Sequence, residues 1–197
     1  MADFQKFLPT LLSLEGGFSN DPHDPGGVTN MGITFPIYKQ HALRLLGVQP
    51  TLDGLKSLTA EQAGKIYKVE YWDRMFGDEI SFEPLANIMF DFYVNAGHHA
   101  FQLLQQVLNA AGGQFDLRAP LRSQTVEALR HHDIIEVYTA YKDGRKAYYR
   151  ALAHEHPVLR RYLKGWLHRV DRFPDFQPQG KGCDPMGNTQ AGAGKAN

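Results

Sequence analysis

The sequence has almost no cysteine and no long apolar run. A single cysteine, Cys183, excludes an internal disulfide framework. No stretch reaches the roughly 18 consecutive apolar residues of a membrane span, so we expect no stable membrane insertion. The first residues also lack a basic region followed by an apolar run, which argues against a standard signal peptide. We therefore expect a protein that is made in the cytoplasm.

Several chemical signatures are missing as well. The histidine pairs 98–99 and 131–132 are adjacent residues, whose side chains diverge by about 100° on a helix and chelate a metal poorly. The segment His154-Glu155-His156 lacks the His-Glu-x-x-His spacing of zinc enzymes. No Gly-x-Ser-x-Gly nucleophile elbow and no glycine-rich phosphate loop occur. We expect no metal, no cofactor and no serine-hydrolase chemistry.

The charge balance is neutral overall but uneven along the chain. Hydrophobic residues make up 43% and charged residues 21% of 197 residues, an ordinary balance for a chain with a sizeable core. Residues 1–100 carry 7 basic against 12 acidic side chains, and residues 101–197 carry 14 against 9. This pattern suits a catalytic cleft beside a surface that tolerates an anionic polymer, or else two ordinary solvated faces. No basic block has the density that nucleic-acid binding requires.

Apolar residues recur with helical spacing through most of the chain, and no alternating strand pattern has useful length. The sequence predicts helices over residues 4–15, 37–46, 59–72, 120–129, 133–152 and 157–170. The longest periodic run, residues 85–111, predicts a long central helix that bends near Gly97. Residues 29–34 could be extended. The fold class is therefore mainly α, with little or no sheet.

Glu15 lies four residues after Leu11 and so continues the apolar stripe of the first helix. It also ends that helix, where the macrodipole opposes a negative charge. Apolar burial and the dipole both favour the protonated carboxyl, the form that a general acid needs. Gly16 and Gly17 stop the helix and allow close approach of a sugar chain. From spacing alone, a glutamate facing solvent at a helix end is the alternative.

The following residues favour the catalytic interpretation. Glu15-Gly16-Gly17-Phe18, followed by Gly26-Gly27-Val28-Thr29-Asn30-Met31-Gly32-Ile33-Thr34, resembles the N-terminal signature of glycoside hydrolase family 108. These are lysozyme-like N-acetylmuramidases that are frequent in phages and prophages. Further matches are Tyr71-Trp72 and residues 90–97. The C-terminal part, with Tyr148-Tyr149, Gly165-Trp166 and Arg169-Val170, resembles the predicted peptidoglycan-binding segment that accompanies the catalytic module. The resemblance covers roughly residues 4–172.

The resemblance implies that Glu15 is the catalytic glutamate. The family commonly has Tyr after Glu-Gly-Gly, and Phe18 stands here, so stacking on a sugar is kept while a hydroxyl is lost. A second carboxylate is harder to assign. Asp24, or Asp21 before it, could position a water, although both lie in strong turn-forming sequences. A mechanism with one glutamate, in which Thr29 or Thr34 holds the water, is the alternative.

Other side chains are candidates for substrate binding. Asp91 and Asn95 are one helical turn apart and off the apolar stripe, so both could face a cleft or an exposed helix face. An amide such as that of Asn95 can donate to and accept from an N-acetyl group. Tyr71 and Trp72 could pack against sugar rings, although a tryptophan is more commonly in the core.

These residues predict a peptidoglycan hydrolase. The expected reaction is cleavage of the β-1,4 bond between N-acetylmuramic acid and N-acetylglucosamine in glycan strands, with Glu15 as general acid. The alternatives are a lytic transglycosylase acting on the same bond and a non-catalytic wall-binding or secretion-accessory protein. The resemblance suggests a monomeric, endolysin-type bacteriolytic protein that acts in the periplasm or cell wall after release through a holin or export by a secretion system.

The predicted division of the chain has three parts. Residues 1–112 form a lysozyme-like catalytic part, and residues 113–172 form a helical peptidoglycan-binding segment packed on it. Residues 173–197, rich in Gly, Pro, Gln and Asn, form a flexible tail.

Overall fold

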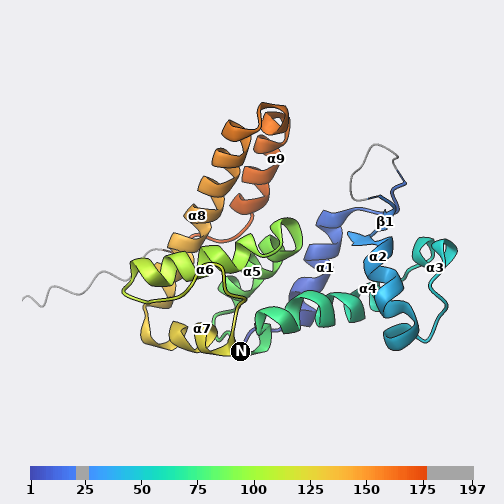
Figure 1. Ribbon diagram of the computed structural model, residues 1–197, viewed down its shortest axis with the longest axis horizontal. Helices are drawn as coiled ribbons and strands as arrows, with labels where there is room; N and C mark the ends of the chain where they lie inside the picture. Colours follow the sequence, from blue (N-terminus) through green and yellow to red (C-terminus); the bar gives the residue numbers. More distant parts are fainter. Residues whose placement is uncertain (21–26, 177–197) are drawn as a thin grey trace, which may run out of the picture.

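The computed structural model describes residues 1–20 and 27–176, and the chain is mainly α (Figure 1). The α-helices and strands are α1 (Phe4–Glu15), β1 (Thr29–Asn30), β2 (Ile33–Thr34), α2 (Phe35–His41), α3 (Leu52–Lys56), α4 (Ala60–Tyr67), α5 (Glu83–Ala96), α6 (His99–Ala110), α7 (Ser123–Glu127), α8 (Ile134–Glu155) and α9 (Arg160–Asp171). Short π-helical turns cover Ala42–Leu46 and Lys68–Trp72, and 3-10 turns cover Asp73–Met75, Gly77–Glu79, Ala128–His131 and Pro157–Leu159. The predicted fold class is confirmed.

Helix α1 forms because its sequence supplies both an N-terminal capping residue and a stripe of apolar side chains. The Asp3 carboxylate accepts a hydrogen bond from the backbone N–H of Gln5 at 3.0 Å, which satisfies one of the free donors at the helix start. Its buried side chains are Phe4, Phe7, Leu8 and Leu11. The helix ends at Gly16, whose backbone has φ 77° and ψ −172°, a conformation that needs glycine. Glu15 is therefore the last helical residue.

Residues 29–34 form a tight β-hairpin, as the sequence allowed. Thr29 pairs with Thr34 and Asn30 pairs with Ile33, which leaves Met31 and Gly32 as a two-residue turn. Both turn residues have positive φ, 49° and 74°, as the favoured hairpin turns require. The Asn30 amide anchors the hairpin by donating to the carbonyls of Leu55 and Lys56 at 2.9 and 3.1 Å.

The run predicted as one long central helix is two helices, α5 and α6. Gly97 separates them with φ 58° and ψ −135°, and its N–H donates to the carbonyl of Tyr93 at 2.9 Å. Periodicity does not reveal this break because both helices bury apolar faces in one core, which keeps the stripe continuous. Within this core, Phe4, Trp72 and Phe90 contact one another edge-on or tilted, with ring centroids 5.4–5.7 Å apart.

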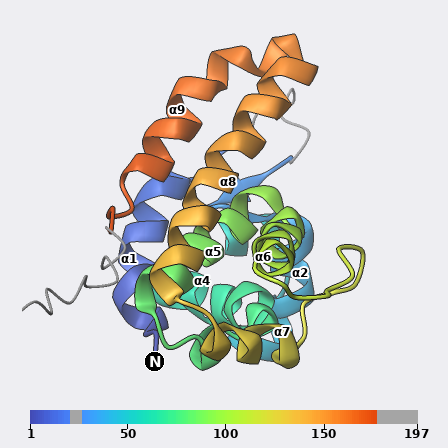
Figure 2. The same ribbon diagram turned by 90° about the vertical axis from the view of Figure 1, so that its left-hand side faces the viewer.

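Helices α8 and α9 form an antiparallel hairpin that rises from the body (Figure 1). The Asp133 carboxylate caps α8 by accepting from the N–H groups of Ile135 and Glu136 at 2.8 and 3.2 Å. The root of α8 packs against α5 and α6, while the C-terminal end of α9 returns to lie beside α1 (Figure 2). The C-terminal segment thus reaches the end of α1 that carries Glu15.

Residues 173–176, which the sequence analysis placed in a flexible tail, pack against α8. Phe173 is buried, and its carbonyl accepts from the Lys142 ammonium at 2.6 Å. The Tyr138 hydroxyl donates to the carbonyl of Pro174 at 2.6 Å, and Lys142 also pairs with Asp175 at 2.6 Å. Residues 177–197, with Cys183, lie outside the described residues. Within the part of the chain that is described, no helix is long and apolar enough to cross a membrane.

Candidate active site

Glu15 points into the fold at the junction of three segments. Its side chain is only 15% exposed, and its Oε1 accepts a hydrogen bond from the Arg169 guanidinium at 2.5 Å. The apolar stripe of α1 predicted this inward orientation. The structure adds a basic partner that lies 154 residues away in the chain.

The turn of the β-hairpin lies directly against Glu15. A Cβ atom on Gly32 would stand 2.8 Å from Oε2 of Glu15 and 3.0 Å from its Cβ, and would also collide with the Tyr67 hydroxyl. Only glycine leaves room for the carboxyl at this place. The Tyr67 hydroxyl donates to the carbonyl of Met31 at 2.8 Å and so fixes the turn from the α4 side.

Tyr67 is a neutral donor in this arrangement. Its pKa is raised well above the ordinary value for tyrosine, first by burial and then by the negative charge of Glu15. Tyr71, one turn further along, contacts Tyr67 with ring centroids 5.4 Å apart. Burial, followed by the charge of Glu70, raises the pKa of Tyr71 to about 12. Both phenols therefore stay protonated at neutral pH.

Behind Glu15, four charged groups alternate in sign. Arg169 donates to Asp91 through its Nε at 3.0 Å and through a terminal nitrogen at 2.6 Å, in addition to its bond to Glu15. Asp91 also accepts from Arg145 at 2.5 Å, and the side chains of Asp91 and Arg145 are 0% exposed. We call Glu15, Arg169, Asp91 and Arg145 the charge ladder. A buried chain of this kind is stable only when every charge has its partner.

The environment of Arg169 keeps it charged. Burial by itself would lower the pKa of the guanidinium, but the hydrogen bonds and negative charges of Asp91 and Glu15 outweigh burial and raise it above its ordinary value. Two aromatic rings also contact the Arg145 guanidinium. Its central carbon lies 5.0 Å from the ring centre of Phe92 and 5.7 Å from that of Tyr149.

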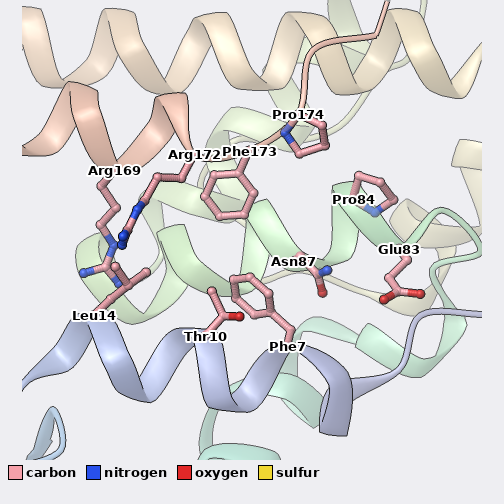
Figure 3. Close-up of a pocket in the computed structure, with 10 residues that line it drawn as sticks. All are labelled: Phe7, Thr10, Leu14, Glu83, Pro84, Asn87, Arg169, Arg172, Phe173 and Pro174. Carbon is pink, nitrogen blue, oxygen red and sulfur yellow. The ribbon is translucent and has the colours of Figure 1, made fainter.

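Arg169 also lines a largely apolar pocket of about 350 Å³ (Figure 3). Phe7, Thr10 and Leu14 of α1 form one wall, and Asn87 of α5 stands opposite (Figure 3). Glu15 is not among the residues that line it. Because Arg169 lines the pocket, small solutes that enter it can reach the guanidinium.

Several predicted substrate-binding residues lie around Glu15 and the hairpin. Phe18 is 43% exposed, three residues after Glu15, where an aromatic face is available to a sugar. Thr29 and Thr34 are partly buried and face each other across the hairpin. The Thr34 hydroxyl accepts from the N–H of Ile37 at 3.5 Å and caps α2, so it keeps a free donor. Tyr71 is partly buried beside Tyr67.

Two predicted contacts with sugar are wrong in this structure. Trp72 is 0% exposed in the aromatic core, and its indole N–H donates to Asp78 at 2.7 Å, so its ring cannot stack on a substrate. Asp91 faces the charge ladder and not a cleft, because two arginines from α8 and α9 enclose it. Asn95 is exposed and donates to the carbonyl of Asp91 at 2.7 Å. Asp21 and Asp24 lie outside the described residues.

The sequence did contain a signal for the charge ladder that the analysis of motifs missed. Arg145 lies four residues from both Tyr141 and Tyr149, inside the apolar stripe of α8. Arg169 likewise follows Trp166 by three residues on α9. Asp91 follows Ile88 by three residues on α5 and is buried like it, so the prediction that Asp91 lies off the apolar stripe is wrong. A charge inside an apolar stripe must be paired once it is buried. The sequence around each charged residue does not show which other charge it pairs with.

Known proteins resemble the chain in the region that builds this site. The family model described as glycosyl hydrolase 108 matches residues 8–97, which contain Glu15, the hairpin, Tyr67 and Asp91. Among solved structures, SagA of Brucella abortus superposes with a TM-score of 0.68 and 29% sequence identity, over 86% of this chain and 90% of that one. None of the curated proteins matches the chain. The SagA likeness extends beyond the matched region into the C-terminal helices.

Proposed function

We propose that this chain, whose residues 8–97 match the glycosyl hydrolase 108 family model, is a muramidase with Glu15 as the general acid. The bond cleaved is the β-1,4 linkage between N-acetylmuramic acid and N-acetylglucosamine in peptidoglycan. The family and the likeness to SagA support peptidoglycan hydrolysis, and the identity of the bond and of the acid is the proposal.

The observation that carries the proposal is the position of the Glu15 carboxyl. It is 15% exposed, ends a helix and packs against a glycine in a hairpin turn. A glycosidic bond breaks when a carboxylic acid protonates the leaving oxygen, and the acid must reach that oxygen while remaining sheltered from bulk water. Gly16, Gly17 and Gly32 surround Glu15 without side chains that would block a glycan.

The second half of the reaction needs a water molecule at the anomeric carbon. Asp91 is unsuited to activate it, because both arginines of the charge ladder occupy its oxygens. Asp24 therefore remains the proposed water-positioning carboxylate, and Thr29 and Thr34 are the proposed neutral alternatives. A separation of roughly 6.5–9.5 Å between the two carboxyls would give inversion, and about 5–5.5 Å would give retention.

Digestion of purified peptidoglycan tests the bond. Mass spectrometry of the products is expected to show reducing N-acetylmuramic acid ends. Reducing N-acetylglucosamine ends would assign a different glycosidic bond. Products ending in 1,6-anhydromuramic acid would show a lytic transglycosylase, in which the substrate's own hydroxyl replaces water.

A pair of glutamine variants tests the acid. Glu15→Gln is expected to fold and to lose essentially all activity, because an amide cannot donate the proton. Glu70→Gln is the matched control, since Glu70 is 12% exposed and pairs with an arginine, Arg74, at 2.8 Å. We expect that control to keep its activity. Equal clearing of a peptidoglycan gel by Glu15→Gln and the unchanged protein would leave only a wall-binding or accessory role.

We also propose that the protein acts as a monomer in the periplasm or cell wall, where peptidoglycan lies. Release through a holin, as for a phage or prophage endolysin, and export by a secretion system are the two proposed routes. Expression with and without a pore-forming partner separates them. Lysis only when the pore is present supports the first route, and wall damage without it supports the second.

A further inference from the structure

We propose that Arg169 of α9 is a positioning residue that determines which oxygen of Glu15 carries the transferable proton. The inference rests on the proposed role of Glu15 as general acid and extends it to a residue outside the region that matches the family model. It makes the C-terminal helical hairpin part of the catalytic centre, in addition to any part that it has in wall binding.

The hydrogen-bond chemistry of the two side chains leads to this assignment. A guanidinium has only donors, so an oxygen that receives its N–H bond cannot present a proton in the same direction. Oε1 of Glu15 receives that bond from Arg169 at 2.5 Å. When Glu15 is protonated, its proton is therefore placed on Oε2, the oxygen beside the hairpin turn, where Gly32 has no side chain to cover it.

The charge ladder holds Arg169 in place for this task. Its Nε and one N–H of its terminal nitrogen Nη2 bind Asp91, and the same Nη2 also donates to Glu15. Asp91 is fixed in turn by Arg145, so the guanidinium has little freedom to swing away. A lysine could not replace it, because an ammonium is a point donor that lacks the planar fork joining two carboxylates.

The proposed step transfers a proton from Glu15 to the glycosidic oxygen. The Oε2–H bond breaks and its proton goes to the glycosidic oxygen, while the bond from that oxygen to the anomeric carbon breaks and leaves its electron pair on the oxygen. Water supplies a hydroxyl to the anomeric carbon, and its remaining proton returns to Glu15 through solvent. Arg169 stabilises the carboxylate that forms on Glu15, because it is already aimed at the developing charge.

Kinetics of Arg169 variants on soluble glycan fragments of defined length provide the test. Arg169→Ala is expected to lower kcat by about 100-fold, the loss typical of a misplaced catalytic group, and to change KM little. Arg169→Lys is expected to fold and still to lose on the order of tenfold in kcat, since it cannot bind both carboxylates. Arg172→Ala is the matched control, because Arg172 is exposed and lies within one turn of Arg169 without bonding Glu15.

Chemical rescue distinguishes a positioning role of Arg169 from a merely structural one. The pocket beside Arg169 opens a path for a small cation to the vacated position (Figure 3). Millimolar methylguanidinium is expected to restore part of the kcat of Arg169→Ala, whereas methylammonium at the same concentration is not. Glu15→Gln is expected to respond to neither compound.

The possible outcomes separate the two proposals. A wild-type kcat in folded Arg169→Lys or Arg169→Ala, with Glu15→Gln inactive, overturns the role of Arg169 and leaves the proposed function intact. Active Glu15→Gln overturns the proposed function itself. Should Arg169→Ala fail to fold, Arg169→Lys decides alone, since it keeps the charge and most of the side-chain volume.

Discussion

Gly32 and Glu15 touch so closely that neither position is free to change. The missing side chain of Gly32 leaves the space that the Glu15 carboxyl occupies, because a Cβ atom there would stand 2.8 Å from Oε2. The same glycine has φ 74°, which completes the hairpin turn. One residue thus meets a backbone requirement and shapes the site.

Replacing Gly32 with alanine should therefore remove activity as well as stability. The positive φ alone costs an alanine about 1–2 kcal/mol. The collision adds to this cost and displaces Glu15, and a displacement of about 1 Å can cost about 100-fold in rate. Gly47→Ala is the matched control, since Gly47 has φ 67° with nothing within 4 Å of a Cβ. Urea unfolding and kcat of both variants check the prediction, which fails if the two variants lose activity equally.

Asp91→Asn should be among the most destabilising single substitutions in the molecule. It removes the negative charge between two arginines and leaves Arg145 buried without a counter-charge, a change that typically costs about 3–5 kcal/mol. Chemical denaturation at neutral pH measures the loss. Asp171→Asn, which breaks the exposed pair with Lys146 at 2.7 Å, is the control and should change stability little. Similar unfolding midpoints for the two variants would contradict the charge ladder as described.

Tyr67→Phe should reduce activity beyond its effect on stability. It removes the hydroxyl that fixes the carbonyl of Met31 at 2.8 Å, and such a bond contributes about 0.5–1.5 kcal/mol net. The hairpin turn then loses its contact with α4, and the surroundings of Glu15 loosen. Tyr141→Phe removes a comparable bond, to the carbonyl of Ala100 at 3.0 Å, far from the hairpin. Both should lower the melting temperature similarly, and only Tyr67→Phe should lower kcat.

The local half of the candidate active site could be predicted from sequence. Helical phase and the glycines after Glu15 predicted its inward position, and the Gly-Gly-x-Thr-x-x-Gly-Ile-Thr segment predicted an extended element nearby. These features depend on residues close together in the chain, where propensity and periodicity act. The Asx cap at Asp133 was predictable for the same reason.

The long-range half could not be predicted in this way. The bond between Arg169 and Glu15 joins residues 154 positions apart, and that between Arg145 and Asp91 joins residues 54 apart. Helical spacing shows that each charge lies on an apolar stripe, but the pairing depends on how α5, α8 and α9 pack. Trp72 was misassigned for a related reason, since an aromatic residue has the same sequence signature in a cleft as in a core.

Tyr71 predicts how stability changes at high pH. Its pKa is raised from 10.0 to about 12, first by burial, so the unfolded chain loses this proton before the folded protein does. The stabilisation from the neutral phenol is therefore complete below about pH 10 and is lost as the pH rises toward about 12. Melting temperatures measured by circular dichroism should fall across this window, and they should fall less steeply in Tyr71→Phe. The difference in melting temperature between the two proteins at neutral pH serves as the reference. Parallel curves would show that the Tyr71 phenol does not titrate as its burial beside Tyr67 and Glu70 requires.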